Sequence, residues 1–399
     1  MKRLACSTLT VSFALGLSFV ARAESGSSPD DDAVVDSSVG SSAPGSSRAA
    51  SPASCPEEPA WTRCAGVIGE LFAGYRDGTV GGDRASEFLL DRAEVRGEAA
   101  WREGESRVGG VVARVEAIRS AGPQSLFGID GDSIVFRVRE AYGHGGLRVG
   151  EVDVSARLGL VPERWLELVR DGYDLRALDP LVSDLRYFDR SDLGATATAS
   201  AWDGLVSLDL SVVNGEGLAQ RELNHGKNTT LVLSVRPLRG ADLSWSLHGA
   251  YRDGSIGLGS ARNHRLALAS TVRSTWLVGG GEYVRALGLD AQGDRRSQAA
   301  SAWLGAHVLA PQWGLAGKYD WIDDDIDTSG SGIHRVSAGV FADVLTGDIS
   351  RRLRLYLAYQ HERYGDAAGA LPGAPEALDV HRVLVQMHAR ADLFYSDRE

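Results

Sequence analysis

Lysine is almost absent from this chain of 399 residues. It occurs only at Lys2, Lys227 and Lys318, so arginine supplies nearly all of the positive charge. The formal net charge is nevertheless −11. Nucleic-acid-binding proteins carry a clustered basic surface, and an acidic chain with so few lysines does not suggest one. We therefore expect no nucleic acid among its partners.

Long apolar runs are missing beyond the first 25 residues, because charged residues or glycines interrupt each of them. A membrane-spanning helix needs about 20 consecutive apolar residues, so none is expected there. At the start, Lys2 and Arg3 precede an apolar run over 9–20, and the A-x-A pattern at 21–23 follows. These features predict a secretory signal peptide over 1–23. The alternative is a membrane anchor, for which the run is short.

Cysteine is also scarce, with three in the chain, and one of them would leave with the signal peptide. Cys55 and Cys64 remain, in "SCPEEPAWTRC", and an even pair in an exported protein predicts a disulfide. No histidine lies nearby to support a zinc site. Residues 24–60 are rich in serine, alanine, proline and aspartate. That composition predicts a disordered acidic linker, with the folded part over 61–399.

The chain does contain segments in which apolar and polar residues alternate. From Val383 to Tyr395, every second residue is apolar or aromatic, and the residues between them are polar except Leu384. Side chains alternate between the two faces of a β-strand, so this segment predicts a strand with one apolar and one charged face. Similar runs from Val67 onward predict sixteen strands. They are expected at 67–75, 87–98, 107–118, 133–142, 146–155, 192–201, 205–213, 229–237, 242–252, 264–272, 275–285, 297–309, 313–321, 332–344, 351–362 and 381–395.

The links between these runs alternate between long and short. Short links are expected at 143–145, 202–204, 238–241, 273–274, 311–312 and 345–350, with 99–106 slightly longer. Long links are expected at 76–86, 119–132, 156–191, 214–228, 253–263, 286–296, 322–331 and 363–380. Long loops at one end and short turns at the other are typical of bacterial transmembrane β-barrels. In lipid, only a closed sheet leaves no unpaired edge. We therefore predict an all-β, sixteen-stranded antiparallel barrel in the outer membrane of a Gram-negative-type bacterium.

Three segments resemble the phosphate-selective porin O and P family. They are "FLLDRAEVRGEAAW" (88–101), "IVFRVREAYGHGGLRVGEVDV" (134–154) and "RYFDRSDLGATATASAWDGLVSLDLSVVNGEG" (186–217). The last one contains an R-x-D-x-G strand and a hairpin that ends in Asn-Gly, at Arg190, Asp192, Gly194, Asn214 and Gly215. The resemblance implies a sixteen-stranded trimeric outer-membrane channel. The expected partners are outer-membrane lipid, small hydrophilic or anionic solutes such as phosphate, and two further copies of the chain.

The longest link, 156–191, is the candidate constriction, since the third long loop of sixteen-stranded porins commonly folds into the channel. Within it, "PERWLELVRDG" has helical spacing and a proline near its start, which predicts a short helix. The link carries six arginines together with several aspartates and glutamates. One hypothesis is an arginine-bearing constriction. The alternative is an outward loop whose charges neutralise one another.

Arginines also fall on the polar face of several strands. Guanidinium groups bind oxyanions through paired hydrogen bonds, and rings of arginine favour anions in a pore. The alternative is a wall of mixed charge in which glutamates pair with them. The candidate pore-lining and constriction residues are Arg137, Arg139, Arg157, Arg164, Arg170, Arg176, Arg352, Arg354, Arg382 and Arg390.

Motifs for catalysis or metal binding do not emerge from the sequence. The nine histidines are scattered, without HExxH or HxxEH spacing. The acidic segment 323–332 could hold a divalent cation, but an exposed acidic loop is the simpler interpretation. We expect no cofactor and no catalysis. The leading functional hypothesis is a passive diffusion channel. The alternatives are a plugged or structural barrel and an outer-membrane barrel enzyme.

Overall fold

The computed structural model describes residues 61–399, apart from 81–82, 104–106, 120–133, 177, 216, 218–224, 241, 258–260, 290–291, 311, 349–350, 366–378 and 399. The predicted signal peptide and linker lie outside the described residues, as does Cys55 (1–60 are not described). Cys64 is buried in the first strand. The leader, the linker and the Cys55–Cys64 disulfide therefore stay predictions.

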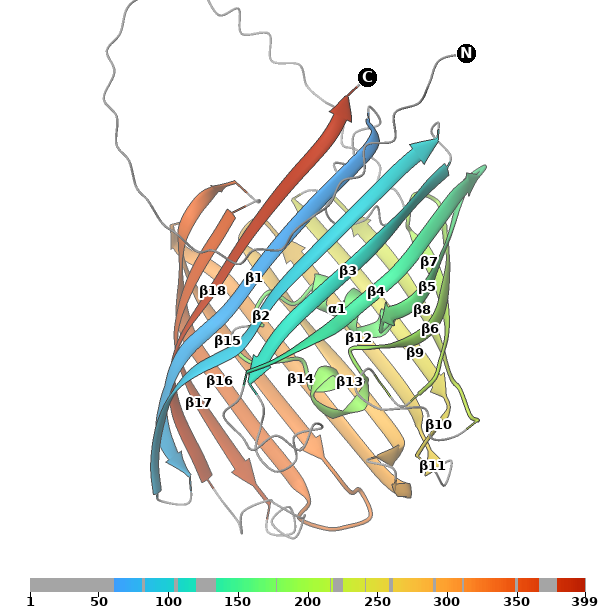
Figure 1. Ribbon diagram of the computed structural model, residues 1–399. Helices are drawn as coiled ribbons and strands as arrows, with labels where there is room; N and C mark the ends of the chain where they lie inside the picture. The colour runs from blue at the N-terminus through green and yellow to red at the C-terminus, as the bar shows by residue number, and fades with distance from the viewer. Residues whose placement is uncertain are drawn as a thin grey trace, which may run out of the picture. The chain divides into compact units, whose positions relative to one another are not determined.

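Sixteen antiparallel strands close into one barrel, as the alternation predicted (Figure 1). Each strand pairs with its neighbours in the chain, except that β9 pairs directly with β12, and β1 closes the barrel against β18. The barrel strands are β1(Trp61–Val80), β2(Asp83–Glu103), β3(Arg107–Arg119), β4(Ile134–Val149), β5(Val152–Pro162), β6(Ser191–Ala201), β7(Val206–Val213), β8(Asn228–Arg239), β9(Leu243–Asp253), β12(His264–Ser274), β13(Leu277–Leu289), β14(Gln292–Ala310), β15(Trp313–Asp323), β16(Gly332–Asp348), β17(Arg351–Tyr364) and β18(Asp379–Arg398).

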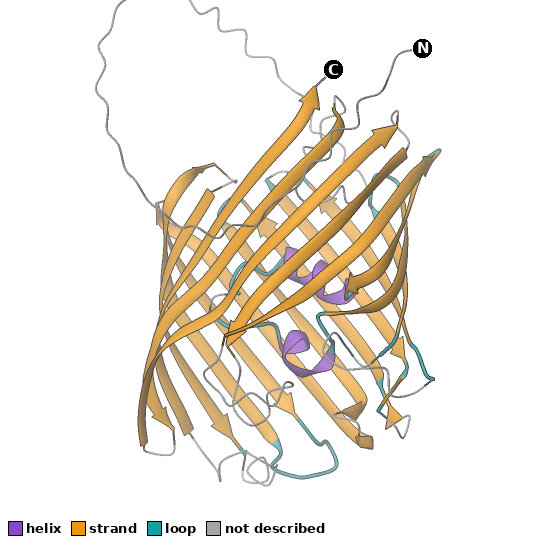
Figure 2. Ribbon diagram, in the orientation of Figure 1, coloured by secondary structure: helices purple, strands orange, loops and turns teal. Residues whose placement is uncertain are grey.

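The remaining elements are small. Strands β10(Ser255–Ile256) and β11(Ala261–Arg262) form a two-stranded ribbon in the link between β9 and β12. The helix α1(Arg164–Asp171) and one turn of π-helix, η2(Ser183–Tyr187), lie inside the barrel (Figure 2). No helix among the described residues is both long enough and apolar enough to cross a membrane.

The predicted alternation of faces is present in β18. Val383, Val385 and Leu393 are exposed on the outside of the barrel, while Gln386 and His388 between them are buried. Tryptophans near the short links and tyrosines near the long links border the apolar outer band. Such aromatic girdles mark the two membrane interfaces of a transmembrane barrel. The exposed members are Trp101, Trp202 and Trp313 at one end, and Tyr251, Tyr319 and Tyr359 at the other.

One predicted turn is wrong. The glycine-rich segment 143–145 was expected to join two strands, but it lies within β4, where Gly143 pairs with both β3 and β5. The chain turns instead at Gly150 and Glu151, and Gly150 adopts the positive φ that this turn requires. Glycines inside a strand still form the backbone hydrogen bonds of the sheet. A prediction that placed the turn at a cluster of glycines was therefore wrong here. The strand count was right because β5 begins later than expected, at Val152.

Two of the expected long links are also wrong. Strands β1 and β2 pair out to Val80 and Asp83, so only residues 81–82 connect them. Strands β13 and β14 pair out to Leu289 and Gln292, with residues 290–291 between them. In both hairpins the backbone ladder continues beyond the apolar band, where alternation is no longer needed. The expected link 156–191 shortens for the same reason to residues 163–190.

Candidate functional site

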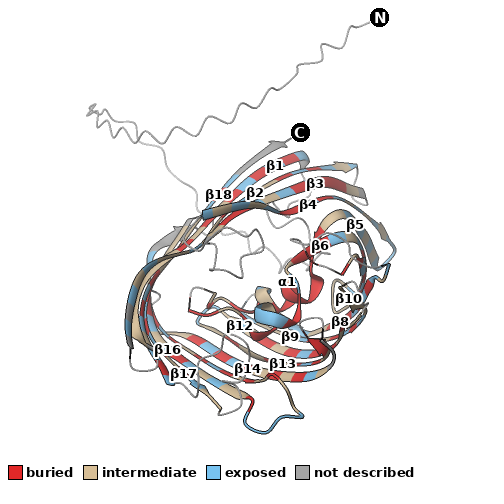
Figure 3. Cartoon of the chain, turned by 60° about the horizontal axis from the view of Figure 1, so that its bottom comes forward, coloured by how far each residue is buried: buried red, intermediate tan, exposed pale blue. Residues whose placement is uncertain are grey.

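The segment 163–190 joins β5 to β6 and lies inside the barrel (Figure 3). We call it the inner loop. Its helix α1 (Arg164–Asp171) begins two residues after Pro162, carries Glu167 in its first turn and is followed by Gly172. A proline just before a helix and a glycine just after it are typical boundaries, so the helix predicted from "PERWLELVRDG" is confirmed. The inward position favours the constriction hypothesis over an outward loop.

An apolar patch of the inner wall holds this loop. The inner loop buries a series of apolar side chains, and Trp165, Val169 and Leu175 among them are fully inaccessible. Full burial of such a side chain stabilises by about 1.5–3 kcal/mol. The wall opposite them carries small apolar residues in place of the expected polar ones. These residues form what we call the inner bed: Val232, Ala250, Ala267, Ala269, Val284, Ala286, Ala299 and Ala316.

Polar contacts fix the inner loop at points around the barrel. Arg164 of α1 donates to Asp209 of β7 at 2.7 Å, and Arg157 of β5 donates to Glu167 at 2.6 Å. Further contacts reach β12 to β17. They are Arg265 to the carbonyl of Tyr187, Ser183 N–H to Glu282, Tyr187 with Ser297, Lys318 to the carbonyl of Pro180, Arg335 with Asp179, and Arg352 with Asp174. Because the contacts are spread over the circumference, the loop has a fixed place in the lumen.

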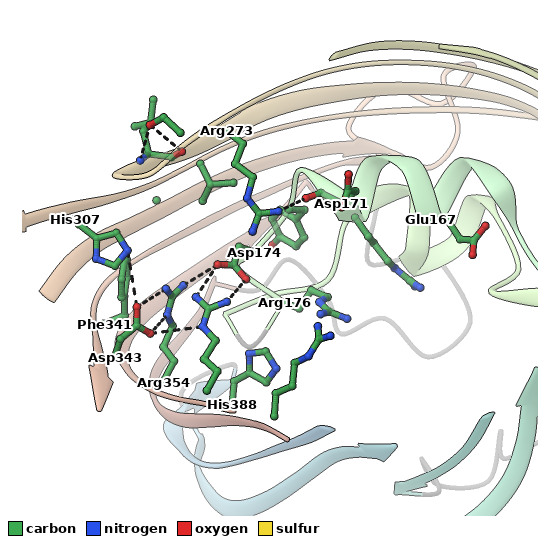
Figure 4. Close-up of a pocket in the computed structure, with 18 of the residues that line it drawn as sticks. Glu167, Asp171, Asp174, Arg176, Arg273, His307, Phe341, Asp343, Arg354 and His388 are labelled. Atoms are coloured by element: carbon green, nitrogen blue, oxygen red, sulfur yellow. Dashed lines mark hydrogen bonds and ion pairs between the residues drawn. The ribbon is translucent and has the colours of Figure 1, made fainter. Parts of the chain in front are cut away.

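A cavity of about 780 Å³ remains beside the inner loop, between the loop and the walls of the lumen (Figure 4). Charged side chains dominate its lining, with eight arginines and six carboxylates. The arginines are Arg114, Arg170, Arg176, Arg190, Arg273, Arg352, Arg354 and Arg390. The carboxylates are Glu140, Glu163, Glu167, Asp171, Asp174 and Asp343. The cavity is therefore a water-compatible space with an excess of fixed positive charge.

On the β17 side of the cavity the charges balance. Arg352 binds Asp174 of the inner loop through two hydrogen bonds of 2.7 Å. Arg354 binds Asp343 in the same bidentate way, at 2.5 and 2.7 Å, and also reaches Asp174 at 3.2 Å (Figure 4). Two guanidinium groups thus meet two carboxylates. This group anchors the loop and leaves no net charge on that wall.

On the β2–β4 side the charges do not balance. Six arginines and four carboxylates form one connected set of contacts within 4 Å, which we call the arginine network. Its arginines are Arg92, Arg114, Arg137, Arg139, Arg170 and Arg190, and its carboxylates are Glu94, Glu116, Glu140 and Asp184. Among the described residues, two formal positive charges of this network are left over. Four members, Arg114, Glu140, Arg170 and Arg190, also line the cavity.

Burial and the surrounding charges change the pKa of groups in the inner loop. Burial lowers the pKa of Arg170 to about 10, with Arg139 and Arg190 adding to the effect and Asp184 opposing it. Burial disfavours the ionised form of Glu167, but Arg157 and Arg164 outweigh it and lower the pKa to about 2.

The pKa values of two other carboxyl groups of the inner loop are shifted in opposite directions. Burial opposes ionisation of Asp184, but Arg170 and Arg190 still hold its pKa below the usual value. Glu163 differs, because burial raises its pKa despite the guanidinium of Arg252 beside it. Among Glu163, Glu167 and Asp184, Glu163 is thus the carboxyl that protonates most readily.

The ten candidate residues divide into two groups. Arg170, Arg176, Arg352, Arg354 and Arg390 line the cavity. The other five lie outside its lining, each in contact with an acid: Arg137 with Glu116, Arg139 with Glu94, Arg157 and Arg164 with Glu167, and Arg382 with Glu362.

Even the cavity-lining arginines have acidic partners, since Arg176 contacts Glu70 at 3.3 Å and Arg390 contacts Asp392 at 2.8 Å. Sequence reasoning missed Arg273, which lines the cavity from β12 and donates to the carbonyl of Asp171 at 2.9 Å. Arg273 fell in the expected short link 273–274, where alternation assigns no face. The sequence alone does not indicate which acidic residue of another strand or loop pairs with a given arginine.

A serine–histidine contact is present, although the sequence suggested none. Ser234 and His248 lie 2.9 Å apart through Oγ and Nδ1, and both are buried in the inner wall. A catalytic pair needs a third group that orients the histidine. Nε2 of His248 has no hydrogen-bond partner among the described residues. The same part of the chain contains no cluster of three or more potential metal ligands.

Comparisons with known proteins identify a fold and no family. No family model matches the sequence, and no curated protein matches it. The fold is similar to that of an anion-selective porin from Comamonas acidovorans (13% identity, 82% of this chain and 100% of that chain, TM-score 0.53).

Two further solved structures share the architecture. One is OmpF of Salmonella typhi in complex with daunomycin (12% identity, 81% and 97% coverage, TM-score 0.56). The other is OmpT, an outer membrane protein of Vibrio cholerae in trimer form (14% identity, 83% and 100% coverage, TM-score 0.50). At these identities the likeness concerns the barrel alone. The chain has the fold of the sixteen-stranded porins.

Proposed function

We propose that this chain is an outer-membrane channel through which small hydrophilic solutes diffuse passively, with a preference for anions. The apolar outer band fits a bilayer, and the cavity beside the inner loop is lined by charge. The arginine network carries the preference, because six guanidinium groups share four carboxylates. A surplus of fixed positive charge in a narrow lumen raises the local concentration of anions.

Phosphate belongs to the class of anions that such a network would hold, because guanidinium groups bind oxyanions through paired hydrogen bonds. Support for phosphate comes from the sequence segments that resemble phosphate-selective porins, and support for anions in general comes from the charge count. The Comamonas acidovorans porin, whose barrel is similar, is itself an anion-selective porin.

The test is the reversal potential of the purified channel in a potassium chloride gradient. The wild-type channel should prefer chloride, and Arg114→Gln combined with Arg190→Gln should reduce or reverse that preference by removing the network's surplus. Arg285→Gln is the matched control, since Arg285 is exposed on the outer face of β13 and should leave selectivity unchanged. Cation preference in the wild type, or equal selectivity in the double variant, would contradict the proposal.

A plugged barrel is the second candidate, favoured by the many contacts between the inner loop and the wall. Single-channel conductance separates the two functions. A channel gives defined current steps in a planar bilayer, whereas a plugged barrel inserts without them.

A homotrimer is the proposed assembly. Outward positions of β1 to β6 include a group of alanines and glycines, whereas those of β7 to β18 carry mainly leucine, valine and tyrosine. A smooth surface of small side chains allows close packing of a second barrel. Light scattering of the detergent complex should give three chains, and Ala113→Trp on this face should lower that number. The exposed small residues are Ala65, Ala99, Ala113, Ala141, Gly143, Gly145, Ala156, Ala195, Ala197 and Ala199.

A further inference from the structure

Four polar side chains meet on the outside of the barrel at its long-link end. His334 lies on β16, His361 and Arg363 on β17, and His381 on β18. Strand register places His334 directly opposite Arg363, and His361 directly opposite His381. His334, Arg363 and His381 are exposed, and His361 is partly exposed. We call these four residues the rim patch.

Two tyrosines contact the histidines of the rim patch through their hydroxyl groups. The hydroxyl of Tyr319 lies 2.8 Å from Nδ1 of His334, and that of Tyr359 lies 2.6 Å from Nδ1 of His381. The rings of His361 and His381 stack at 4.5 Å, nearly parallel. With Nδ1 engaged by tyrosine, Nε2 is the ring nitrogen of His334 and His381 left for an outside partner. The patch is therefore preorganised.

The position of the rim patch along the barrel identifies its surroundings. On each strand the patch follows the exposed apolar band, by two residues in β16 (Val336), two in β18 (Val383) and four in β17 (Leu357). Tyr319 lies directly opposite Val336, and Tyr359 lies directly opposite Val383, so both tyrosines of the aromatic girdle stand at the end of this band. The long-link end of a bacterial barrel faces outward. The rim patch thus lies at the level of the headgroups of the outer leaflet.

We infer that the rim patch docks the phosphate headgroup of an outer-leaflet lipid. Arg363 makes no ion pair with any described residue, so its guanidinium group is available for a bidentate phosphate contact. The imidazoles of His334 and His381 supply further N–H donors beside it. The tyrosine side chains contribute an apolar surface for the first part of the acyl chains.

The charges around the patch permit this partner. Asp379 is the one described carboxylate that contacts it, with Oδ1 lying 3.5 Å from Nε2 of His361. Register also sets Asp379 opposite Arg363. This carboxylate lies beside His361, so the arginine and the two outer imidazoles face the lipid. A free phosphate ion offers the same chemistry, but only the lipid also uses the apolar tyrosine surface.

The test measures lipid binding by the full-length folded chain in detergent. The probes are diphosphoryl lipid A and the same lipid with its phosphates removed. The wild type should bind the phosphorylated lipid more tightly. Combined replacement of His334→Gln, Arg363→Gln and His381→Gln should weaken that binding by about tenfold, since a charge-assisted hydrogen bond carries that much. Heat-modifiable gel mobility confirms that each variant has folded.

Arg285→Gln is again the matched control, because it removes one exposed outward arginine away from the histidines. It should bind lipid A as the wild type does. Unchanged binding in the triple variant overturns the inference, and so does equal binding of the dephosphorylated lipid or an equal loss in the control. Binding of inorganic phosphate with lipid-like affinity, lost in the triple variant, assigns the site to free phosphate and also overturns it.

Discussion

Asp174 of the inner loop and Arg352 of β17 face each other through two hydrogen bonds of 2.7 Å. The same carboxylate receives Arg354 at 3.2 Å. A carboxylate shared by two guanidinium groups ties the loop to the wall and also cancels positive charge beside the cavity. Its removal therefore separates the mechanical role of this contact from its electrostatic role.

Asp174→Asn should increase anion preference, because it leaves Arg352 beside the cavity with a weaker partner, Asp343 at 3.6 Å. Reversal potentials in a salt gradient measure the change. Arg352→Gln is the paired variant and should shift selectivity in the opposite direction. A shift of the same sign in both variants would show that displacement of the loop, and not charge, controls permeation.

Trp165→Ala should loosen the inner loop. Trp165 is fully buried and stacks near Phe188, with ring centroids 6.0 Å apart, and truncation of a buried tryptophan costs about 3–5 kcal/mol. We expect noisier single-channel currents and faster tryptic cleavage within α1. The control is Trp313→Ala, which changes an exposed tryptophan beside a short turn. Equal protease resistance in both variants would contradict a role of Trp165 in holding the loop.

The contacts that Glu167, Asp174 and Asp184 make for the inner loop should be insensitive to pH from about 8 down to about 4. The pKa of Glu167 is lowered to about 2, and those of Asp174 and Asp184 lie below the usual value. Carboxyls of lowered pKa stabilise the folded state above their unfolded pKa of about 4, and this contribution is lost as pH falls through the folded value. Conductance measured against pH provides the check.

The pH experiment is best done in a variant that combines Glu163→Gln with Glu282→Gln, which removes the loop carboxyl whose pKa burial raises and the buried wall carboxyl that accepts from Ser183 N–H. Conductance should then stay constant until the solution is more acidic than about pH 4. A step in conductance between about pH 5 and 8 in that variant would contradict the lowered pKa values of Glu167, Asp174 and Asp184.

The disulfide between Cys55 and Cys64 remains a prediction from export and from an even cysteine count. Cys64 is buried at the start of β1. Mass spectrometry of protein taken from the cell envelope should find both thiols resistant to alkylation until a reductant is added. Two alkylated cysteines without reduction would rule it out.

The barrel was predictable from the sequence because lipid imposes one apolar position in two, and Val383, Val385 and Leu393 follow that rule. The organisation of the lumen was not. Arg164 looked like a constriction residue, yet it binds Asp209 on a strand 45 residues away, and no local pattern encodes such a distant partner.

The inner bed could be predicted in part from the sequence. In the segment around Ala267 and Ala269, inward positions are as apolar as outward ones. That loss of alternation was a signal that something apolar covers the wall from inside. No sequence pattern identified the inner loop as that cover, since its helix is amphipathic enough to suit several surfaces.

The inner bed also constrains the order in which the protein can be built. The inner loop ends at residue 190, but the residues of the bed belong to β8 to β15, which the ribosome and any export route deliver later. Contacts between distant parts of a chain form late, and apolar surface left uncovered in the meantime promotes aggregation. Trp165 and its neighbours therefore lack their apolar cover until β8 to β15 are in place.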